Sequence, residues 1–120
     1  MSWLELSIII VIVLFFLWRM MPTKGISHIT PEELKQKLKQ KDIQLIDVRT
    51  PSEFKARNIK AFINMPLNTL NNSSVTKLSK EKEVIVICQS GMRSNKASKL
   101  LKKLGFRKVT NVKGGMNAWM

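Results

Sequence analysis

Cys88 is the residue of this chain whose type and position best suit covalent chemistry. It is the only cysteine in 120 residues, and it ends an apolar run over Val84 to Cys88. A short polar loop follows, and then Asn95 to Leu104, which is compatible with a helix. An apolar, β-branched run predicts a strand buried on both faces of a sheet. The cysteine is therefore expected near a helix N-terminus, where unpaired backbone N–H groups favour the thiolate.

The loop after the cysteine favours a nucleophile over the alternative, a small hydrophobe that closes a strand. Gly91 can adopt a positive φ and turn the amides of the loop inward. Arg93 either supplies charge for an anionic donor or braces the loop, and both roles stay open. A single cysteine excludes an internal disulfide, and the lone His28 lies far away in sequence, so we predict no metal site.

A second group of charged residues follows the predicted strand Ile43 to Val48. Asp47 and Arg49 lie at its end, and Glu53 lies in a short helix predicted from Thr50 through about Arg57. If the strands are parallel, these side chains point toward the same edge of the sheet as the cysteine. We expect Asp47 to be a buried, hydrogen-bonded brace rather than a reacting group, and Arg49 and Glu53 could pair with each other.

Strands and helices alternate along residues 26–120, which predicts an α/β domain with a largely parallel sheet. Two helices begin with the same signal, a threonine followed by proline and, three residues after the threonine, glutamate, at Thr30 and at Thr50. The segment from Leu67 to Ser79 is polar and is predicted to be a loop with one or two helical turns. The remaining strands are expected at Ile26 to Ile29, Ala61 to Met65 and Val109 to Val112.

Trp3 to Met21 predicts a transmembrane anchor helix, because only Glu5, Ser7 and Arg19 are polar there. A helix of that length covers about 28 Å at ~1.5 Å per residue, close to the ~30 Å hydrocarbon core of a bilayer. A cleaved signal peptide would want a basic residue before the run and a small-residue cleavage site after it, and neither is present. We therefore expect an anchor over residues 1–21, a linker over 22–25 and a domain over 26–120.

The net charge of +13, from 21 basic and 8 acidic residues, favours anionic partners such as acidic lipid, nucleic acid or thiosulfate. A solvated basic surface is an equally good interpretation. Nucleic acid is not a predicted partner, because the lysines are spread along helices and most aromatic residues occupy core-like positions. Arg19 and Lys24 follow the apolar span, which predicts a single-pass membrane protein with its domain in the reducing cytoplasm.

Four ordered motifs resemble the rhodanese-like domain family. They are Ile46 to Phe54, Ile63 to Leu67, Cys88 to Ser94, and Gly114 to Trp119, and the resemblance covers about Ile26 to Trp119. It implies a five-stranded parallel sheet flanked by helices, with the cysteine in the loop after the fourth strand. It also implies a sulfurtransferase, with no metal or organic cofactor, whose cysteine takes a sulfane sulfur from a donor such as thiosulfate. The resulting persulfide passes that sulfur to a thiophilic acceptor, cyanide or a thiol.

The resemblance makes Cys88 the catalytic residue and Asp47, Arg49 and Glu53 supporting residues. The substrate-binding loop comprises Gln89, Ser90, Gly91, Met92, Arg93 and Ser94, whose backbone N–H groups would hold the thiolate and the persulfide. Four residues separate the cysteine from the arginine. Cysteine-based phosphatases of similar architecture have a loop one residue longer, so sulfur transfer is favoured over phosphoryl transfer.

One departure and one alternative accompany the resemblance. Family members often read Gly-His-Ile-x-Gly-Ala where this chain has Arg57 to Phe62, so both glycines are missing. The alternative function is a membrane-tethered persulfide carrier or protein-binding module with little turnover of its own. Its partner would be a protein that donates or accepts sulfur.

Overall fold

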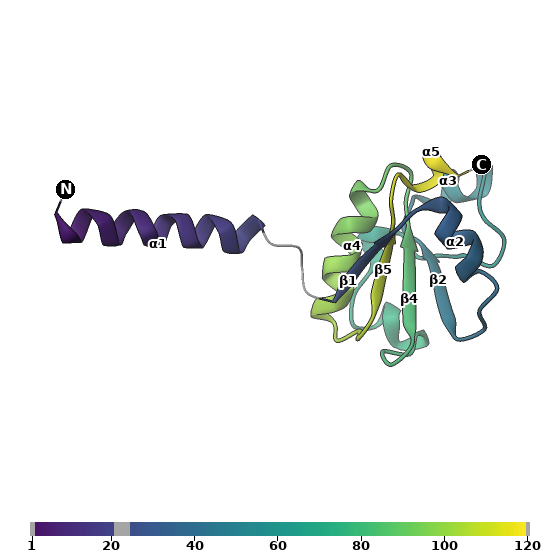
Figure 1. Ribbon diagram of the computed structural model, residues 1–120. Coiled ribbons are helices and arrows are strands. Elements are labelled where there is room, and N and C mark those ends of the chain that lie inside the picture. Colours follow the sequence, from purple (N-terminus) through teal and green to yellow (C-terminus); the bar gives the residue numbers. More distant parts are fainter. Residues whose placement is uncertain (1, 21–24, 120) are drawn as a thin grey trace.

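The computed structural model describes residues 2–20 and 25–119, which form an N-terminal helix and an α/β domain (Figure 1). The helices are α1 (Trp3–Met20), α2 (Pro31–Lys37), α3 (Pro51–Ala56), α4 (Met92–Lys103) and α5 (Gly115–Ala118), with 3₁₀ turns η1 (Leu67–Thr69) and η2 (Ser74–Lys77). The strands are β1 (Ile26–Ile29), β2 (Ile43–Asp47), β3 (Ile63–Asn64), β4 (Glu83–Ile87) and β5 (Val109–Val112). Met1 and Met21 of the predicted anchor, the predicted linker except Gly25, and Met120 lie outside the described residues.

The strands form one five-stranded sheet in the order β1-β5-β4-β2-β3, and every neighbouring pair is parallel. This confirms the predicted α/β class and the parallel sheet. β4 lies in the centre, and all five of its residues are buried, as expected for a strand covered on both faces. Because parallel strands end at one edge, the segments that follow β2 and β4 meet there.

Two hydrophobic clusters cover the two faces of the sheet. Val84 and Val86 pack on one face with Ala97 and Leu101 of α4. Ile85 and Ile87 alternate with them and pack on the other face, where Leu34 of α2 contributes to the second cluster. The helices α2 and α4 therefore lie on opposite sides of the sheet (Figure 1), and the central strand is held from both.

The two predicted helix starts are confirmed, whereas two other boundaries differ from the prediction. Thr30 and Thr50 each cap a helix, and in each case the glutamate three residues later completes the capping box. β3 covers only Ile63 and Asn64 rather than Ala61 to Met65, and Ala61 is excluded from it by a φ of +83, outside the β region. α4 begins at Met92 rather than at Asn95, so the end of the polar loop forms its first turn.

The predicted transmembrane anchor at Trp3 to Met21 is not supported. α1 spans 18 residues with Glu5 in its first turn. Across residues 2–20 and 25–119, no helix combines the length and the apolar character that crossing a membrane requires. The apolar side chains of α1 are exposed to solvent: Leu14 is 59% exposed and Phe16 is 60% exposed. Figure 1 shows α1 apart from the α/β domain, so the domain core does not include it.

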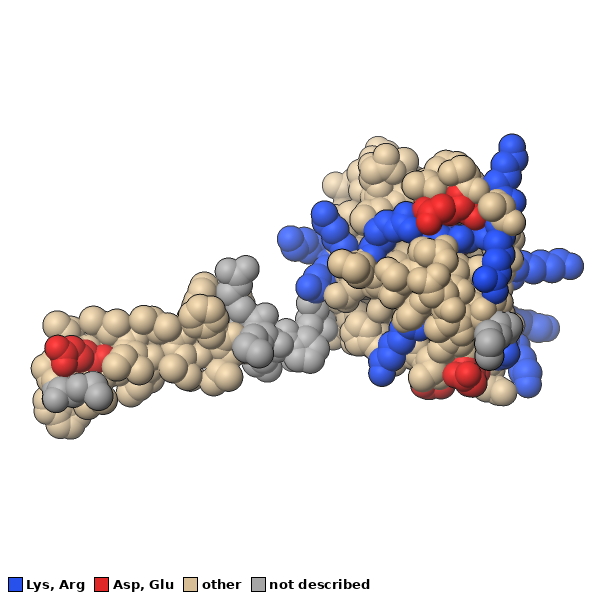
Figure 2. Space-filling model, turned by 90° about the horizontal axis from the view of Figure 1, so that it is seen from above, with Lys and Arg blue, Asp and Glu red and all other residues tan. Residues whose placement is uncertain are grey.

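Lysine and arginine side chains dominate the charged surface of the domain in the view of Figure 2. Acidic side chains form only small areas there. The sequence accounts for this balance, because residues 1–21 contain only Glu5 and Arg19 as charged residues. The whole excess of positive charge therefore belongs to the remainder of the chain.

Candidate active site

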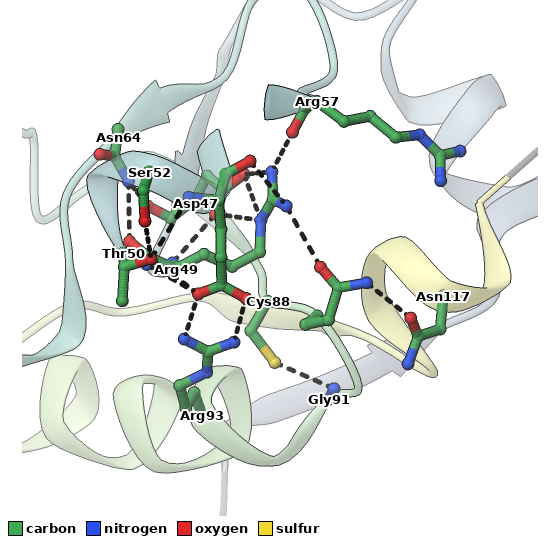
Figure 3. A network of polar contacts seen from close by, with 12 residues as sticks. Asp47, Arg49, Thr50, Ser52, Arg57, Asn64, Cys88, Gly91, Arg93 and Asn117 are labelled. Carbon is green, nitrogen blue, oxygen red and sulfur yellow. Dashed lines mark hydrogen bonds and ion pairs between the residues drawn. The ribbon is translucent and has the colours of Figure 1, made fainter. Parts of the chain in front are cut away.

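Cys88 lies between β4 and α4, at the edge where the strands end, and its side chain is fully buried. The backbone N–H of Gly91 donates a hydrogen bond to its Sγ over 2.9 Å (Figure 3). Gly91 has φ +101, in the left-handed region that favours glycine, and it is the residue that precedes the first turn of α4. The turn thus reverses the chain immediately after the cysteine and aims an amide at the sulfur.

The surroundings of the sulfur lower the pKa of the Cys88 thiol. Burial acts in the opposite direction and raises it, but hydrogen bonds from Ser94, through its hydroxyl and its amide, and from the amides of Gly91 and Ser90 outweigh that cost. The Gly91 amide lies 2.9 Å from the sulfur. The Ser94 hydroxyl also lies 3.2 Å from the Gly91 carbonyl oxygen, to which it can donate instead. The loop therefore favours the thiolate, which is the nucleophilic form of cysteine.

The Gly114-Gly115 segment packs directly against the Cys88 loop. The N–H of Met116 donates to the carbonyl oxygen of Cys88 over 2.8 Å, and the N–H of Asn117 donates to that of Gln89 over 2.9 Å. A Cβ atom at Gly115 would overlap the carbonyl oxygen of Cys88. A residue with a side chain cannot fit there without moving the loop, so this glycine supports the position of the cysteine.

Asp47 and Arg49 form a buried ion pair behind the loop (Figure 3). The guanidinium Nη2 lies 2.8 Å from Asp47 Oδ2, and Nε lies 3.0 Å from Oδ1. The exposed fractions of the two side chains are 2% for Arg49 and 0% for Asp47. Arg49 also donates to the carbonyl oxygens of Glu53 and Arg57 and to the side-chain oxygen of Gln89. These contacts are those of a brace that joins β2, α3 and the Cys88 loop.

Glu53 pairs with Arg93, and not with Arg49 as the sequence suggested. The two carboxylate oxygens of Glu53 accept from Nη1 and Nη2 of Arg93 over 2.7 and 2.9 Å, a bidentate pair. The hydrogen bonds from Arg93 hold the pKa of the Glu53 carboxyl at about 2. They also raise the pKa of Arg93, and its side chain stays 37% exposed. The ion pair therefore fixes the arginine beside the loop while one side of it faces solvent.

The predicted site residues meet at one edge of the sheet, although their roles stay predictions. Among the loop residues, the side chains of Met92, which is 80% exposed, and of Ser90 face solvent, and Ser90 acts on the sulfur through its backbone amide. Within the described part of the chain, no group of three or more His, Cys, Asp or Glu side chains is placed to hold a metal ion.

Sequence reasoning missed three residues that support the site. Asn64 donates from its side-chain amide to the carbonyl oxygens of Asp47 and Arg49, both over 3.0 Å. The carbonyl oxygen of Arg57 accepts from Arg49, and Asn117 accepts from the side chain of Gln89. Asn64 and Asn117 lie inside the motifs quoted above, and that was the available signal. A backbone carbonyl such as that of Arg57 is present in every residue type, so the sequence gives no signal that it is an acceptor.

The arrangement of sheet, loop and glycine segment defines a class of protein. The family model of the rhodanese-like domain matches residues 30–120. The chain therefore belongs to the rhodanese-like domain family.

Named relatives match over most of the domain. A protein called putative sulfurtransferase YtwF from Bacillus subtilis is 38% identical over 95 residues, 78% of this chain and 90% of the relative. A sulfurtransferase from Allochromatium vinosum is 32% identical over 95 residues, 78% of this chain and 88% of the relative. The putative sulfur carrier protein YrkF from Bacillus subtilis is 35% identical over 96 residues, 79% of this chain, but the match spans only 51% of that protein.

Solved structures agree with this assignment. The crystal structure of a rhodanese-like domain protein from Staphylococcus aureus superposes with a TM-score of 0.72 at 34% identity. That match covers 78% of this chain and 91% of the other. Because the two chains share 34% of their residues as well as the fold, the Staphylococcus aureus structure supports the family assignment.

Proposed function

We propose that this protein is a sulfurtransferase that moves a sulfane sulfur through a persulfide on Cys88. Relatives named as sulfurtransferases and as a sulfur carrier support sulfur transfer in general. The observation that carries the proposal is the sulfur of Cys88, buried at the end of β4 with the Gly91 amide donating to it. A ring of amides that stabilises a thiolate also stabilises a persulfide anion, which carries the same charge one atom further out.

The loading step is a displacement at sulfur. The Cys88 thiolate attacks the outer sulfur of thiosulfate, and a new S–S bond forms as the bond to the sulfite group breaks. Sulfite leaves with the electron pair, so the step needs no oxidant and no proton. The amides of Gly91 and its neighbours stabilise the negative charge before and after the transfer.

The unloading step returns the cysteine to its thiolate. Cyanide or an external thiolate attacks the outer sulfur of the persulfide, and the S–S bond breaks with its electron pair on Sγ of Cys88. The product is thiocyanate or a new persulfide. Because the chain contains one cysteine, the attacking thiol must come from another molecule.

The first experiment is the intact mass of the full chain after incubation with thiosulfate. We expect a gain of one sulfur atom that cyanide reverses, with thiocyanate released. The Cys88→Ser variant should gain nothing, and Ser98→Ala is the matched control that alters a buried serine of α4 instead. No gain with thiosulfate or with a low-molecular-weight persulfide would refute transfer at Cys88.

A second candidate function is a persulfide carrier with little turnover of its own. It is favoured by the relative named as a sulfur carrier, of which this chain spans about half the length. The two functions differ in kinetics. A sulfurtransferase releases many equivalents of thiocyanate per chain, whereas a carrier loads one sulfur and discharges it to a particular partner protein.

The location of the domain on the cytoplasmic side of a membrane stays a prediction of the sequence. It rests on Arg19 and Lys24, the positive charges after the apolar segment. Cell fractionation that follows the full chain, with the domain side tested by protease accessibility, is the direct measurement.

A further inference from the structure

A cleft of about 640 Å³ opens beside the Cys88 loop, between α4 and η1. Its apolar lining, here called the floor, includes Val48, Leu67 and Leu100, which are buried or half-buried. Its exposed basic lining, here called the rim, includes Lys96, Lys99 and Lys103. No acidic residue of the described chain lines it. Ligand sites for organic molecules typically measure about 300–1,000 Å³, whereas thiosulfate would fill only a small part of such a space.

The cleft adjoins the loop that follows Cys88. Val48 and Cys88 belong to the same hydrophobic cluster, and Leu67 and Leu100 pack against that cluster. Arg93 lines the cleft and is also part of the loop that follows the cysteine. A molecule in the cleft therefore lies beside the loop that holds Cys88.

Among the described residues, no salt bridge neutralises the three lysines of the rim. The three lysines are three and four residues apart on α4, so they share one face of the helix, where like charges repel. α4 contains no acidic residue. The charge of Arg93 is already paired with Glu53, so the lysines supply the free charge of the cleft. Figure 2, which looks down on the edge where the strands end, shows basic side chains around this end of the domain.

We propose that the cleft binds an organic thiol or persulfide with an apolar arm that ends in sulfur and several negative charges at its other end. This inference rests on the proposed function, because the ligand would exchange sulfur with Cys88. As acceptor, its thiolate attacks the outer sulfur of the Cys88 persulfide. The S–S bond breaks with its electron pair on Sγ, and the ligand leaves as a persulfide anion. The apolar floor holds the arm, and the three lysines hold the charged end.

Binding can be measured without any chemistry in the full-length Cys88→Ser variant. The probes are coenzyme A and pantetheine, which share a thiol-ended arm and differ in the phosphate-bearing end. If each of the three lysines contributes one surface ion pair, coenzyme A should bind roughly tenfold more tightly than pantetheine. This difference in affinity should shrink as the salt concentration rises. Adenosine 3′,5′-bisphosphate, which lacks the arm, should bind more weakly than coenzyme A.

Variants assign the preference to the cleft. Replacing Lys96, Lys99 and Lys103 with glutamine should abolish the roughly tenfold difference between the two thiols. The matched control replaces Lys41, Lys60 and Lys82, which are exposed and do not line the cleft, and should retain it. The proposal would be overturned if coenzyme A and pantetheine bound equally, or if the control variant lost the difference between them as fully as the cleft variant. It would also be overturned if adenosine 3′,5′-bisphosphate bound as tightly as coenzyme A.

Transfer assays separate this proposal from the proposed function. In the sulfur-loaded chain, the ratio of the discharge rates with coenzyme A and with pantetheine should also be roughly tenfold, and cyanide discharge tests persulfide chemistry itself. If no persulfide forms, the proposed function fails while the binding preference can still be measured. If persulfide forms but the two thiols bind and react alike, only the cleft proposal fails.

Discussion

At the scale of single residues, the donors around Cys88 decide whether its sulfur reacts. Burial alone would make this cysteine an inert thiol, and the hydrogen bonds of the loop reverse that tendency. They come from the hydroxyl and amide of Ser94 and from the amides of Gly91 and Ser90, all in the loop after the cysteine. The lowered pKa therefore depends on the Ser94 hydroxyl together with the backbone amides of the loop.

The alkylation rate of Cys88 tests this reversal. The thiolate is the reactive form, so the rate rises as pH passes the thiol pKa, and a lowered pKa moves the midpoint below the ~8.5 of a free cysteine. Ser94→Ala removes a donor to the charged form and should raise the midpoint by about one pH unit. The readout is the pH profile of the reaction with a small alkylating reagent.

Ser98→Ala is the control for that profile, because Ser98 is also a buried serine of α4 but donates to the carbonyl oxygen of Ser94 over 2.7 Å. It should leave the midpoint near that of the unmodified chain. A midpoint at or above ~8.5 in the unmodified chain would mean a structural cysteine.

At the scale of elements, the connection between α3 and β3 contains a non-glycine residue, Ala61, in a left-handed backbone conformation. Ala61 adopts φ +83, in the left-handed region that favours glycine. Left-handed backbone costs a residue with a side chain about 1–2 kcal/mol. The turn is held by its neighbours, since Ile59 and Phe62 are both buried. The fold therefore keeps the turn and accepts local strain.

Ala61→Gly should therefore stabilise the protein. Relief of the strain exceeds the extra entropy of glycine in the unfolded chain, and the net gain in unfolding free energy should be on the order of 0.5–1 kcal/mol. Urea unfolding of the full chain measures it. Ala56→Gly is the matched control: it lies in α3, where glycine should cost roughly 0.5–1 kcal/mol. Destabilisation by both changes would show that the turn at Ala61 is not strained.

At the scale of the whole molecule, an uncovered apolar helix is joined to a strongly basic domain. Large contiguous apolar surfaces on a protein mark places where something else binds. In water, α1 can cover its surface by packing against α1 of another copy, whereas the like charges of the domains oppose that association. Salt screens the repulsion and leaves the apolar attraction in place.

We expect the full chain to self-associate in detergent-free buffer, more strongly as salt rises, and to dissociate in a mild detergent. Sedimentation velocity reads the size of the species. The double change Ile10→Lys and Leu14→Lys places charges one turn apart on α1 and should weaken association by at least tenfold. Ile63→Lys, at an exposed apolar residue of the domain, is the control and should change little. A monomeric full chain without detergent would contradict this expectation.

Much of the fold could be predicted because local signals and burial patterns agree. The capping boxes at Thr30 and Thr50 depend on residues three apart, and the apolar run before Cys88 reports a strand covered on both faces. The transmembrane anchor was the prediction that lost its support. Its apolar pattern predicted a helix correctly, but the described helix does not meet the requirements for crossing a membrane.

The sequence by itself determined the class of fold, the single nucleophile candidate and the glycine loop that follows it, since these depend on residue types at short spacing. Only the tertiary structure decided the partners: Glu53 with Arg93 instead of Arg49, Gly115 against Cys88, and lysines of α4 around an apolar cleft. Such pairs are far apart along the chain. They are set by the order of strands in the sheet and by the packing of helices on it, and no local pattern records that order.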